Sequence, residues 1–202
     1  MKLSGLDAND VQVQEETTIH SGFLKLRHYA ITHKLFNGGT STVLSREAIV
    51  RPPSVGIILF DPSRQQVVLV EQFRIGPYLD NNDPWLLEVV AGISEPGETL
   101  EEVARREVEE ETGYHVASLI PVADFYVSPG ASNEKLKLFC ALVDASEAGG
   151  TFGVSDEGED IKVHVLSLDE AYDMVTDGRI NNAPAVIALQ WLKLRHHQPG
   201  YE

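Results

Sequence analysis

One stretch constrains the fold of this chain more than any other: GISEPGETLEEVARREVEEETGY, residues 92–114. Glycine and proline residues near its start predict a loop. Thr99 and Glu102 then form the pattern of a capping box, in which two side chains satisfy two backbone N–H groups at a helix start. Apolar residues at helical spacing predict a buried stripe, and Gly113 fits the position just beyond a helix end. The stretch therefore predicts a loop, one amphipathic helix and a stop.

The glutamates of this helix are the first functional signal. Glu107 and Glu111 are four residues apart and share one helix face, and Glu110 lies beside them. Like charges at this spacing weaken a helix unless a cation lies between them. A cluster of carboxylate oxygens suits Mg²⁺ or Mn²⁺, which commonly share their coordination shell with the phosphates of a substrate. A solvated acidic helix face is the ordinary alternative, but it does not explain the positions of Arg106 and Gly113.

The stretch resembles the Nudix box, the signature of the Nudix hydrolase superfamily. That box reads glycine, five residues, glutamate, seven residues, Arg-Glu, an aliphatic residue, any residue, Glu-Glu, any residue, glycine and an aliphatic residue. The matching positions are Gly92, Glu98, Arg106, Glu107, Val108, Glu110, Glu111 and Gly113. Tyr114 departs from the pattern, because an aliphatic residue is usual there. We expect this departure to alter packing more than chemistry.

Composition excludes several classes of function. The chain has 202 residues, 43% of them hydrophobic, which suits one domain with a small extension. Its net charge of −15 argues against binding to nucleic acid or to anionic membranes, because both need clustered Lys and Arg. No apolar run has the length of a transmembrane helix, the N-terminal residues lack the apolar core of a signal peptide, and the single cysteine, Cys140, cannot form an internal disulfide. We therefore expect a soluble cytoplasmic protein.

The order of the predicted elements indicates an α/β fold. Residues 1–12 read as a polar end, and from Val13 to residue 51 the pattern is that of antiparallel strands. Strands then flank the box helix, and a last strand precedes two C-terminal helices. This order fits an α/β/α sandwich with a mixed sheet, the arrangement that the Nudix resemblance also implies. Within it, residues 86–93 are predicted as one strand, and residues 76–85 and 147–160 as loops.

The N-terminal strands suggest a division of the chain. We assign residues 1–51 to a β extension and residues 52–202 to the Nudix hydrolase domain. The extension has too few residues to bury a core of its own. It must therefore cover the main domain or reach a second subunit, and its resemblance to exchanged strands in relatives implies a homodimer.

Further stretches are similar to the bacterial ADP-ribose pyrophosphatase family, from about Arg27 to His197. Pro129 stands where a proline marks ADP-ribose pyrophosphatases within the superfamily, and the strings EQFRIG, PWLLEVVAGI and SDEGEDIKVHV are also similar. Taken alone, Pro129 is an ordinary turn residue and the acidic string an ordinary solvated loop. The resemblance covers most of the chain and implies hydrolysis of ADP-ribose.

The resemblance implies a metal site and a general base. Metal would be held by the backbone carbonyl of Ala91 and by the carboxylates of Glu107, Glu111 and Glu159. Glu157, in the acidic loop, would accept the proton of the attacking water. A shift of two residues in this loop exchanges Glu157 with Glu159, so the assignment of the base stays open between them.

Other residues would orient these groups or bind the substrate. Arg106 would position the box glutamates through an ion pair. Glu98 would fix the loop before the helix, and we group it with the substrate-binding residues. Arg74 would bind the diphosphate, and Arg46 would enter the substrate pocket of the neighbouring subunit. Ser128 and the loop after it would shape the ribose end.

The reaction that the resemblance implies is metal-dependent. Two or three Mg²⁺ ions, or Mn²⁺ in their place, would bridge the diphosphate and activate water, giving AMP and ribose 5-phosphate. One alternative is a hydrolase of another nucleotide sugar, such as GDP-mannose. Another is a regulatory Nudix domain that binds a nucleotide without cleaving it. Such domains usually lose a box glutamate, whereas this box retains all of them.

Overall fold

Two compact units make up the chain. The computed structural model describes residues 3–154, 156 and 158–196. The first unit contains Met1–Pro52 and Tyr126–Glu134, and the second contains Pro53–Phe125 and Lys135–Glu202. The sequence-based division at residue 51 did not include the 126–134 segment in the first unit. Backbone pairing accounts for the difference: the N–H of Ile49 donates to the carbonyl of Ala131 at 2.8 Å, and the N–H of Arg51 to the side chain of Asn133 at 2.7 Å.

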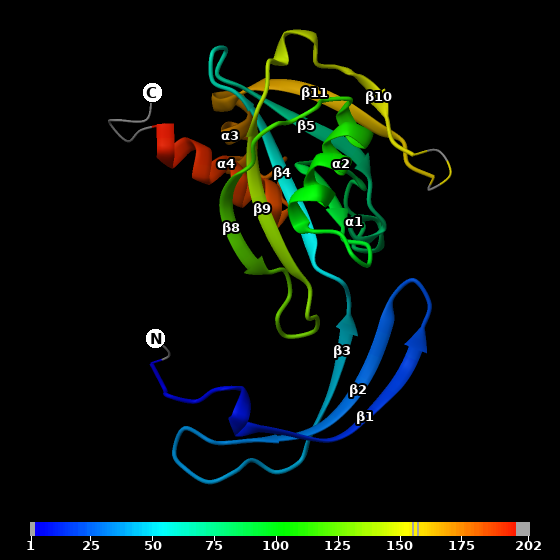
Figure 1. Cartoon of the computed structure of the whole chain (residues 1–202), viewed down its shortest axis with the longest axis vertical. Helices are drawn as coiled ribbons and strands as arrows, with labels where there is room; N and C mark the ends of the chain where they lie inside the picture. Colours follow the sequence, from blue (N-terminus) through cyan, green and yellow to red (C-terminus); the bar gives the residue numbers. More distant parts are fainter. Residues whose placement is uncertain (1–2, 155, 157, 197–202) are drawn as a thin grey trace. The chain divides into compact units, whose positions relative to one another are not determined.

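The first unit is a three-stranded antiparallel sheet, drawn in blue in Figure 1. Its strands are β1 (Val11–Ser21), β2 (Lys25–His33) and β3 (Leu44–Val50), in the order β1-β2-β3. A short 3₁₀ helix, η1 (Ala8–Asp10), precedes β1, so the polar end predicted for residues 1–12 is shorter than expected. Across these three fully described strands, Thr32 is the one buried residue, which leaves the sheet without a core of its own.

The second unit is built on an eight-stranded mixed sheet. Its strands are β4 (Ser54–Asp61), β5 (Gln66–Phe73), β6 (Trp85–Glu88), β7 (Val90–Ile93), β8 (Ile120–Tyr126), β9 (Lys135–Leu142), β10 (Gly150–Phe152) and β11 (Ile161–Ser167). The main path runs β10-β11-β5-β4-β9-β8, with β4 and β9 parallel. The β4 and β5 strands pair only near the turn that joins them. Beyond that point they diverge, and each takes a new partner, β7 for β4 and β6 for β5.

This divergence corrects one prediction. Residues 86–93, expected to form a single strand, are divided at Val89 between β6 and β7, because the two halves pair with different neighbours. The segments predicted as loops also contain regular structure. A short helix, α1 (Ile75–Leu79), lies within residues 76–85, and β10 lies within residues 147–160, just after the 3₁₀ helix η2 (Ala145–Glu147).

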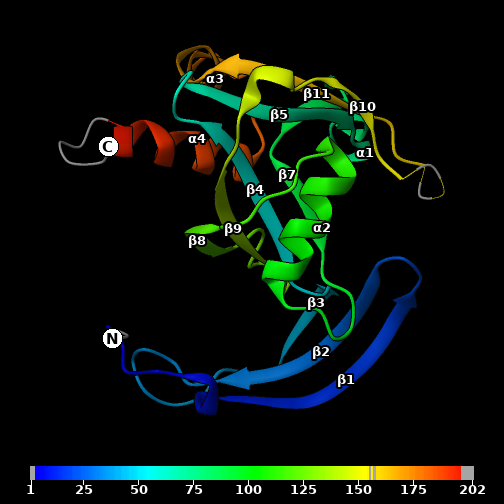
Figure 2. The ribbon, with the colours of Figure 1, turned by 45° about the horizontal axis from the view of Figure 1, so that its top comes forward.

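Helices cover both faces of this sheet, which confirms the α/β/α sandwich (Figure 2). On one face, α2 (Leu100–Thr112) buries Val103 and Val108 against residues of β4 and β5. On the other, α3 (Leu168–Thr176) and α4 (Ala183–His196) pack over the alternate residues of the same strands, including Ile58 and Leu69. This alternation follows from the two-residue period of a strand. Within the described residues, no helix is long and apolar enough to cross a membrane.

Candidate active site

The box helix α2 begins and ends where the sequence predicts. Thr99 is its N-cap, and the hydroxyl of Thr99 accepts from the N–H of Glu102 at 3.3 Å while the Glu102 carboxylate accepts from the N–H of Thr99 at 2.8 Å. Gly113 ends the helix in the left-handed conformation, at φ 73°. Because both ends of α2 are fixed and its apolar residues are buried, the glutamates along this helix have fixed positions as well.

Two of these glutamates are buried next to strand β7. Glu107 is 9% exposed and Glu111 is 2% exposed. The side chain of Glu107 lies against Gly92, where a Cβ atom would overlap its carboxylate. Glu111 accepts a hydrogen bond from the backbone N–H of Ala91. The helix and the strand therefore enclose two carboxylates in a space that only a glycine at position 92 leaves open.

The electrostatics of this pair favour a bound cation. Burial, together with the charges of Glu107 and Glu159, raises the pKa of Glu111 to about 9, although Arg74 and the hydrogen bond from Ala91 oppose this. Burial also raises the pKa of Glu107 to about 7, although Arg106 opposes this. Among the residues that the structure describes, Oε2 of Glu111 is buried and has no hydrogen-bond partner. Buried carboxylates without partners are costly, and a divalent ion supplies the missing charge and ligand contacts.

Arg106 holds the neighbouring glutamates in place. Its Nε and Nη2 atoms donate to the two oxygens of Glu98 at 3.1 and 3.2 Å. Its Nη1 atom donates to Glu107 at 2.8 Å and to Glu110 at 3.0 Å. Glu98 also accepts from the N–H of Glu95 at 2.9 Å, which ties the preceding loop to the helix. Arg106 thus contacts three glutamates of the box, and the assigned roles of Arg106 and Glu98 stay predictions.

The acidic loop contributes one described carboxylate to this region. Glu159 is close enough to raise the pKa of both box glutamates. Its Oε2 atom accepts from the N–H of Val154 at 3.0 Å, and its own N–H donates to the Val154 carbonyl at 3.3 Å. Glu157, the predicted base, lies outside the described residues. In the described part of the chain, no three His, Cys, Asp or Glu side chains are grouped tightly enough to hold a metal as they stand. The residues that fit a cation are the Glu107–Glu111 pair, with Glu159 turned toward the Val154 amide.

Arg74 faces the same carboxylates. It precedes α1, and its guanidinium makes a two-pronged ion pair with Glu88 at the end of β6. Burial lowers the pKa of Arg74, but the hydrogen bonds and charge of Glu88, together with the charges of Glu111 and Glu159, raise it overall. A guanidinium among carboxylates is suited to a phosphate that enters with a metal.

The two remaining predicted residues, Arg46 and Ser128, belong to the first unit. Arg46 lies on β3, opposite Tyr29 of β2, and its Nη1 atom donates to the carbonyl of Ser45 at 2.8 Å. The carbonyl of Ser128 accepts from the N–H groups of Ala131 and Ser132, which closes a tight turn. Their roles in substrate binding stay predictions.

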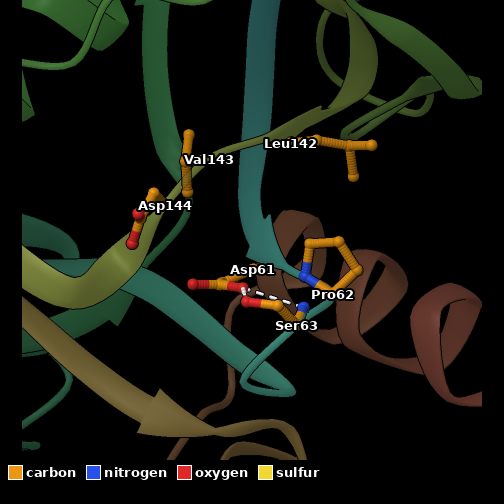
Figure 3. A pocket seen from close by; sticks show the side chains of 6 residues that line it. All are labelled: Asp61, Pro62, Ser63, Leu142, Val143 and Asp144. Atoms are coloured by element: carbon orange, nitrogen blue, oxygen red, sulfur yellow. Dashed lines mark hydrogen bonds between the residues drawn. The ribbon is translucent and has the colours of Figure 1, made fainter.

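A concave region at the far end of β4 differs in character from the site around α2 (Figure 3). This open pocket is lined by Asp61, Pro62, Ser63, Leu142, Val143 and Asp144. Asp61 is buried there, but both of its oxygens accept hydrogen bonds, from Ser63, Arg64 and Ala145. Its hydrogen bonds therefore serve the fold, in contrast to the unsatisfied oxygen of Glu111.

Comparisons with known proteins agree with the geometry around α2. The family model for the NUDIX domain matches residues 50–189. The chain belongs to the Nudix family. The ADP-ribose pyrophosphatase of Escherichia coli (strain K12) is 47% identical over 190 residues, covering 94% of this chain and 90% of that protein. The ADP-ribose pyrophosphatase of Haemophilus influenzae is 42% identical over 192 residues, covering 94% of this chain and 88% of that protein.

More distant relatives give further context to this Nudix chain. The GDP-mannose pyrophosphatase of Pectobacterium atrosepticum is 34% identical over 192 residues, covering 93% of this chain and 96% of that protein. The crystal structure of an ADP compounds hydrolase superposes with a TM-score of 0.68 at 20% identity, covering 94% of this chain and 97% of that one, which supports the fold. The predicted family and fold class are thus confirmed.

Sequence reasoning did not single out Glu88 in this site. Its signal was present, because a glutamate interrupts the otherwise apolar run WLLEVVAGI. Its partner could not be read from the sequence, because the pairing of β6 with β5 is what brings Glu88 to Arg74.

Proposed function

We propose that this Nudix chain hydrolyses the diphosphate bond of ADP-ribose to AMP and ribose 5-phosphate. The observation that carries the proposal is the buried Glu107–Glu111 pair, whose unsatisfied oxygen calls for a cation at a Nudix box. The substrate is supported by relatives named ADP-ribose pyrophosphatase, which are 42% and 47% identical over nearly the whole chain.

The cofactor in this proposal is Mg²⁺, with Mn²⁺ as a substitute and two or three ions per site. Glu107 and Glu111 would hold metal, joined by Glu159 and by the backbone carbonyl of Ala91. The carboxylate oxygens fit a hard divalent ion. When bound, the ions would neutralise the charge of the diphosphate and polarise its P–O bonds.

The remaining steps fall to side chains of the protein. Glu157 would take the proton of the attacking water, with Glu159 as the other candidate for this role. Arg74 would hold the diphosphate, and Arg106 would keep Glu107 in position through the ion pair described above. The geometry that supports these assignments is the contact of Arg106 with three box glutamates and the location of Arg74 among the same charges.

A homodimer completes the proposal. Arg46 would serve the partner subunit's site, and Ser128 would shape the ribose end of the pocket. The support is the first unit itself, whose strands leave apolar side chains such as Val13 (57% exposed) and Ile19 (50%) uncovered. We expect no nucleic-acid or membrane partner at a net charge of −15, and the cytoplasmic location stays a prediction.

The competing substrate is GDP-mannose, favoured by relatives named GDP-mannose pyrophosphatase at 34% identity. The test is a panel of ADP-ribose, GDP-mannose, NADH and diadenosine polyphosphates, compared by kcat/KM with Mg²⁺. We expect a clear preference for ADP-ribose, with AMP as a product, and a loss of at least about 100-fold in Glu107→Gln. Glu109→Gln, on an exposed face of the same helix, is the matched control and should retain activity.

Preference for GDP-mannose would overturn the substrate and keep the metal site. Binding of ADP-ribose without hydrolysis of any substrate in the panel would favour the regulatory alternative.

A further inference from the structure

The ion pair between Arg74 and Glu88 has a geometry that leaves half of the guanidinium free. Nε of Arg74 lies 3.1 Å from Oε2 and 3.3 Å from Oε1 of Glu88, and Nη2 lies 2.8 Å from Oε2. Glu88 therefore occupies one edge of the planar group. Within the described residues, Nη1 of Arg74 has no hydrogen-bond acceptor, so the second edge remains available.

The two side chains differ in exposure, as expected of a buried supporting residue and a substrate-binding residue. The Glu88 side chain is 12% exposed, whereas that of Arg74 is 42% exposed. Glu88 pairs with Val70 across the β5–β6 ladder, and Val70 belongs to the core under α2. Opposite residues of an antiparallel ladder share a face, so Glu88 projects on the side of the sheet that carries the box glutamates.

Without Glu88, Arg74 would have other partners. The charges of Glu111 and Glu159 already act on Arg74. A guanidinium released from Glu88 would be drawn to those carboxylates and would lose the orientation needed to meet a phosphate. Glu88 thus keeps Arg74 apart from the groups expected to hold metal.

We propose that Glu88 is a positioning residue that holds the free edge of Arg74 toward the diphosphate of the substrate. This inference rests on the proposed function, in which Arg74 binds that group. Glu88 makes no contact with the reacting atoms in this scheme and acts through Arg74 alone.

The test is Glu88→Gln, with binding measured separately from turnover. We expect the Kd for ADP-ribose, measured by calorimetry in EDTA, and the KM in Mg²⁺ both to rise about tenfold, and kcat to change by less than about threefold. The direction of the change is informative. Removal of one negative charge near an anion site would by itself tighten binding, so weaker binding reports the loss of Arg74 orientation.

The matched control is Glu71→Gln, which makes the same change in the same sheet. A carboxylate oxygen of Glu71 lies 2.7 Å from Nε2 of His164, and Glu71 is next to Val70 in the strand, so it projects on the opposite face. Glu71→Gln should leave Kd and KM unchanged. Arg74→Ala should weaken binding at least as much as Glu88→Gln, and adding Glu88→Gln to Arg74→Ala should cause no further loss.

Glu88→Asp separates positioning from folding. It retains the charge and should keep Kd within about threefold of the wild type. A Glu88→Gln protein with unchanged or tighter ADP-ribose binding would overturn the inference, as would additive losses in the double variant. Inorganic pyrophosphate is the second probe in these titrations. If the wild type bound pyrophosphate but failed to hydrolyse ADP-ribose, the proposed function would be wrong while the pyrophosphate series still tested Glu88.

Discussion

At the scale of single residues, the site is defined by two carboxyl groups that the fold buries side by side. Glu111 is almost fully buried beside Glu107, and burial raises the pKa of both carboxyls. Arg106 reaches Glu107 but makes no hydrogen bond to Glu111. Keeping these two carboxyl groups buried together lowers the free energy of unfolding of the metal-free protein. Measurements of stability with and without metal therefore report on the site.

Glu111→Gln should therefore stabilise the metal-free protein. Replacing this carboxyl by a neutral amide removes the free-energy cost of keeping it protonated in the folded state at a pH well above its ordinary pKa, and we expect the Tm in EDTA at pH 8 to rise by roughly 5 °C, or about 1–2 kcal/mol for a chain of this size. Mg²⁺ should raise the Tm of the wild type and have little effect on the variant. Differential scanning calorimetry with and without Mg²⁺ measures both effects.

The control for this prediction is Glu109→Gln, which changes an exposed glutamate of the same helix and should move neither Tm by more than about 1 °C. A Glu111→Gln protein that melts lower than the wild type in EDTA, or that Mg²⁺ stabilises as strongly, would contradict the metal assignment.

At the scale of elements, the sequence predicted those features that depend on contacts between residues close together in the chain. The cap at Thr99, the stop at Gly113 and the shared face of the box glutamates all depend on residues within one helix, and all were foreseen. The break at Val89 was not foreseen, because it depends on which distant strand each half pairs with. Glu88 was missed for the same reason: its role depends on a partner fourteen positions away across a ladder.

The turn between β4 and β5 supplies a prediction at this scale. Asp61 accepts from the N–H and hydroxyl of Ser63 at 2.9 and 2.6 Å, and from the N–H of Ala145 at 2.9 Å. The hydrogen bonds from Ser63 and Ala145, with those from Arg64, hold the pKa of Asp61 well below its ordinary value of 3.8, although burial opposes this. The ionised form thus stabilises the fold above about pH 4, and this contribution is lost as pH falls below that value.

Asp61→Asn should consequently lower the Tm by several degrees at pH 7, where the wild-type carboxylate is ionised. The difference between the two proteins should shrink as pH falls below about 4, because the Asp61 carboxyl of the unfolded wild-type chain then becomes protonated while that of the folded protein is still ionised. Thermal melts at pH 7, 5, 4 and 3 measure the trend. The exposed, ion-paired Asp124 provides the control, as Asp124→Asn should change the Tm little at any of these pH values. A Tm difference for Asp61→Asn that stayed constant down to pH 3 would refute the assignment.

At the scale of the whole molecule, the open question is what covers the first unit. Its three strands carry exposed apolar side chains on β1 and, in the N-terminal segment as a whole, exposed aromatics such as Phe23 (90%) and Phe36 (86%). The sequence predicts that this unit lacks a core of its own, because it has so few residues. The sequence does not identify the surface that would cover it, because the matching surface of an identical subunit leaves no local sequence signal. Arg46, which lies on β3, is the residue through which the proposed dimer can be tested.

Subunit complementation tests the proposed dimer through Arg46. Arg46→Ala and Glu107→Gln should each be inactive, the first through lost substrate binding and the second through lost metal binding. If Arg46 serves the partner subunit's site, a heterodimer of the two variants contains one site with both changes and one site with neither. Such a heterodimer, purified through two different affinity tags, should recover about half of the wild-type kcat per dimer. If Arg46 acts within its own subunit, both sites carry one change each and the heterodimer stays inactive. Sedimentation of the wild type as a fully active monomer would remove the dimer and the assigned role of Arg46 together.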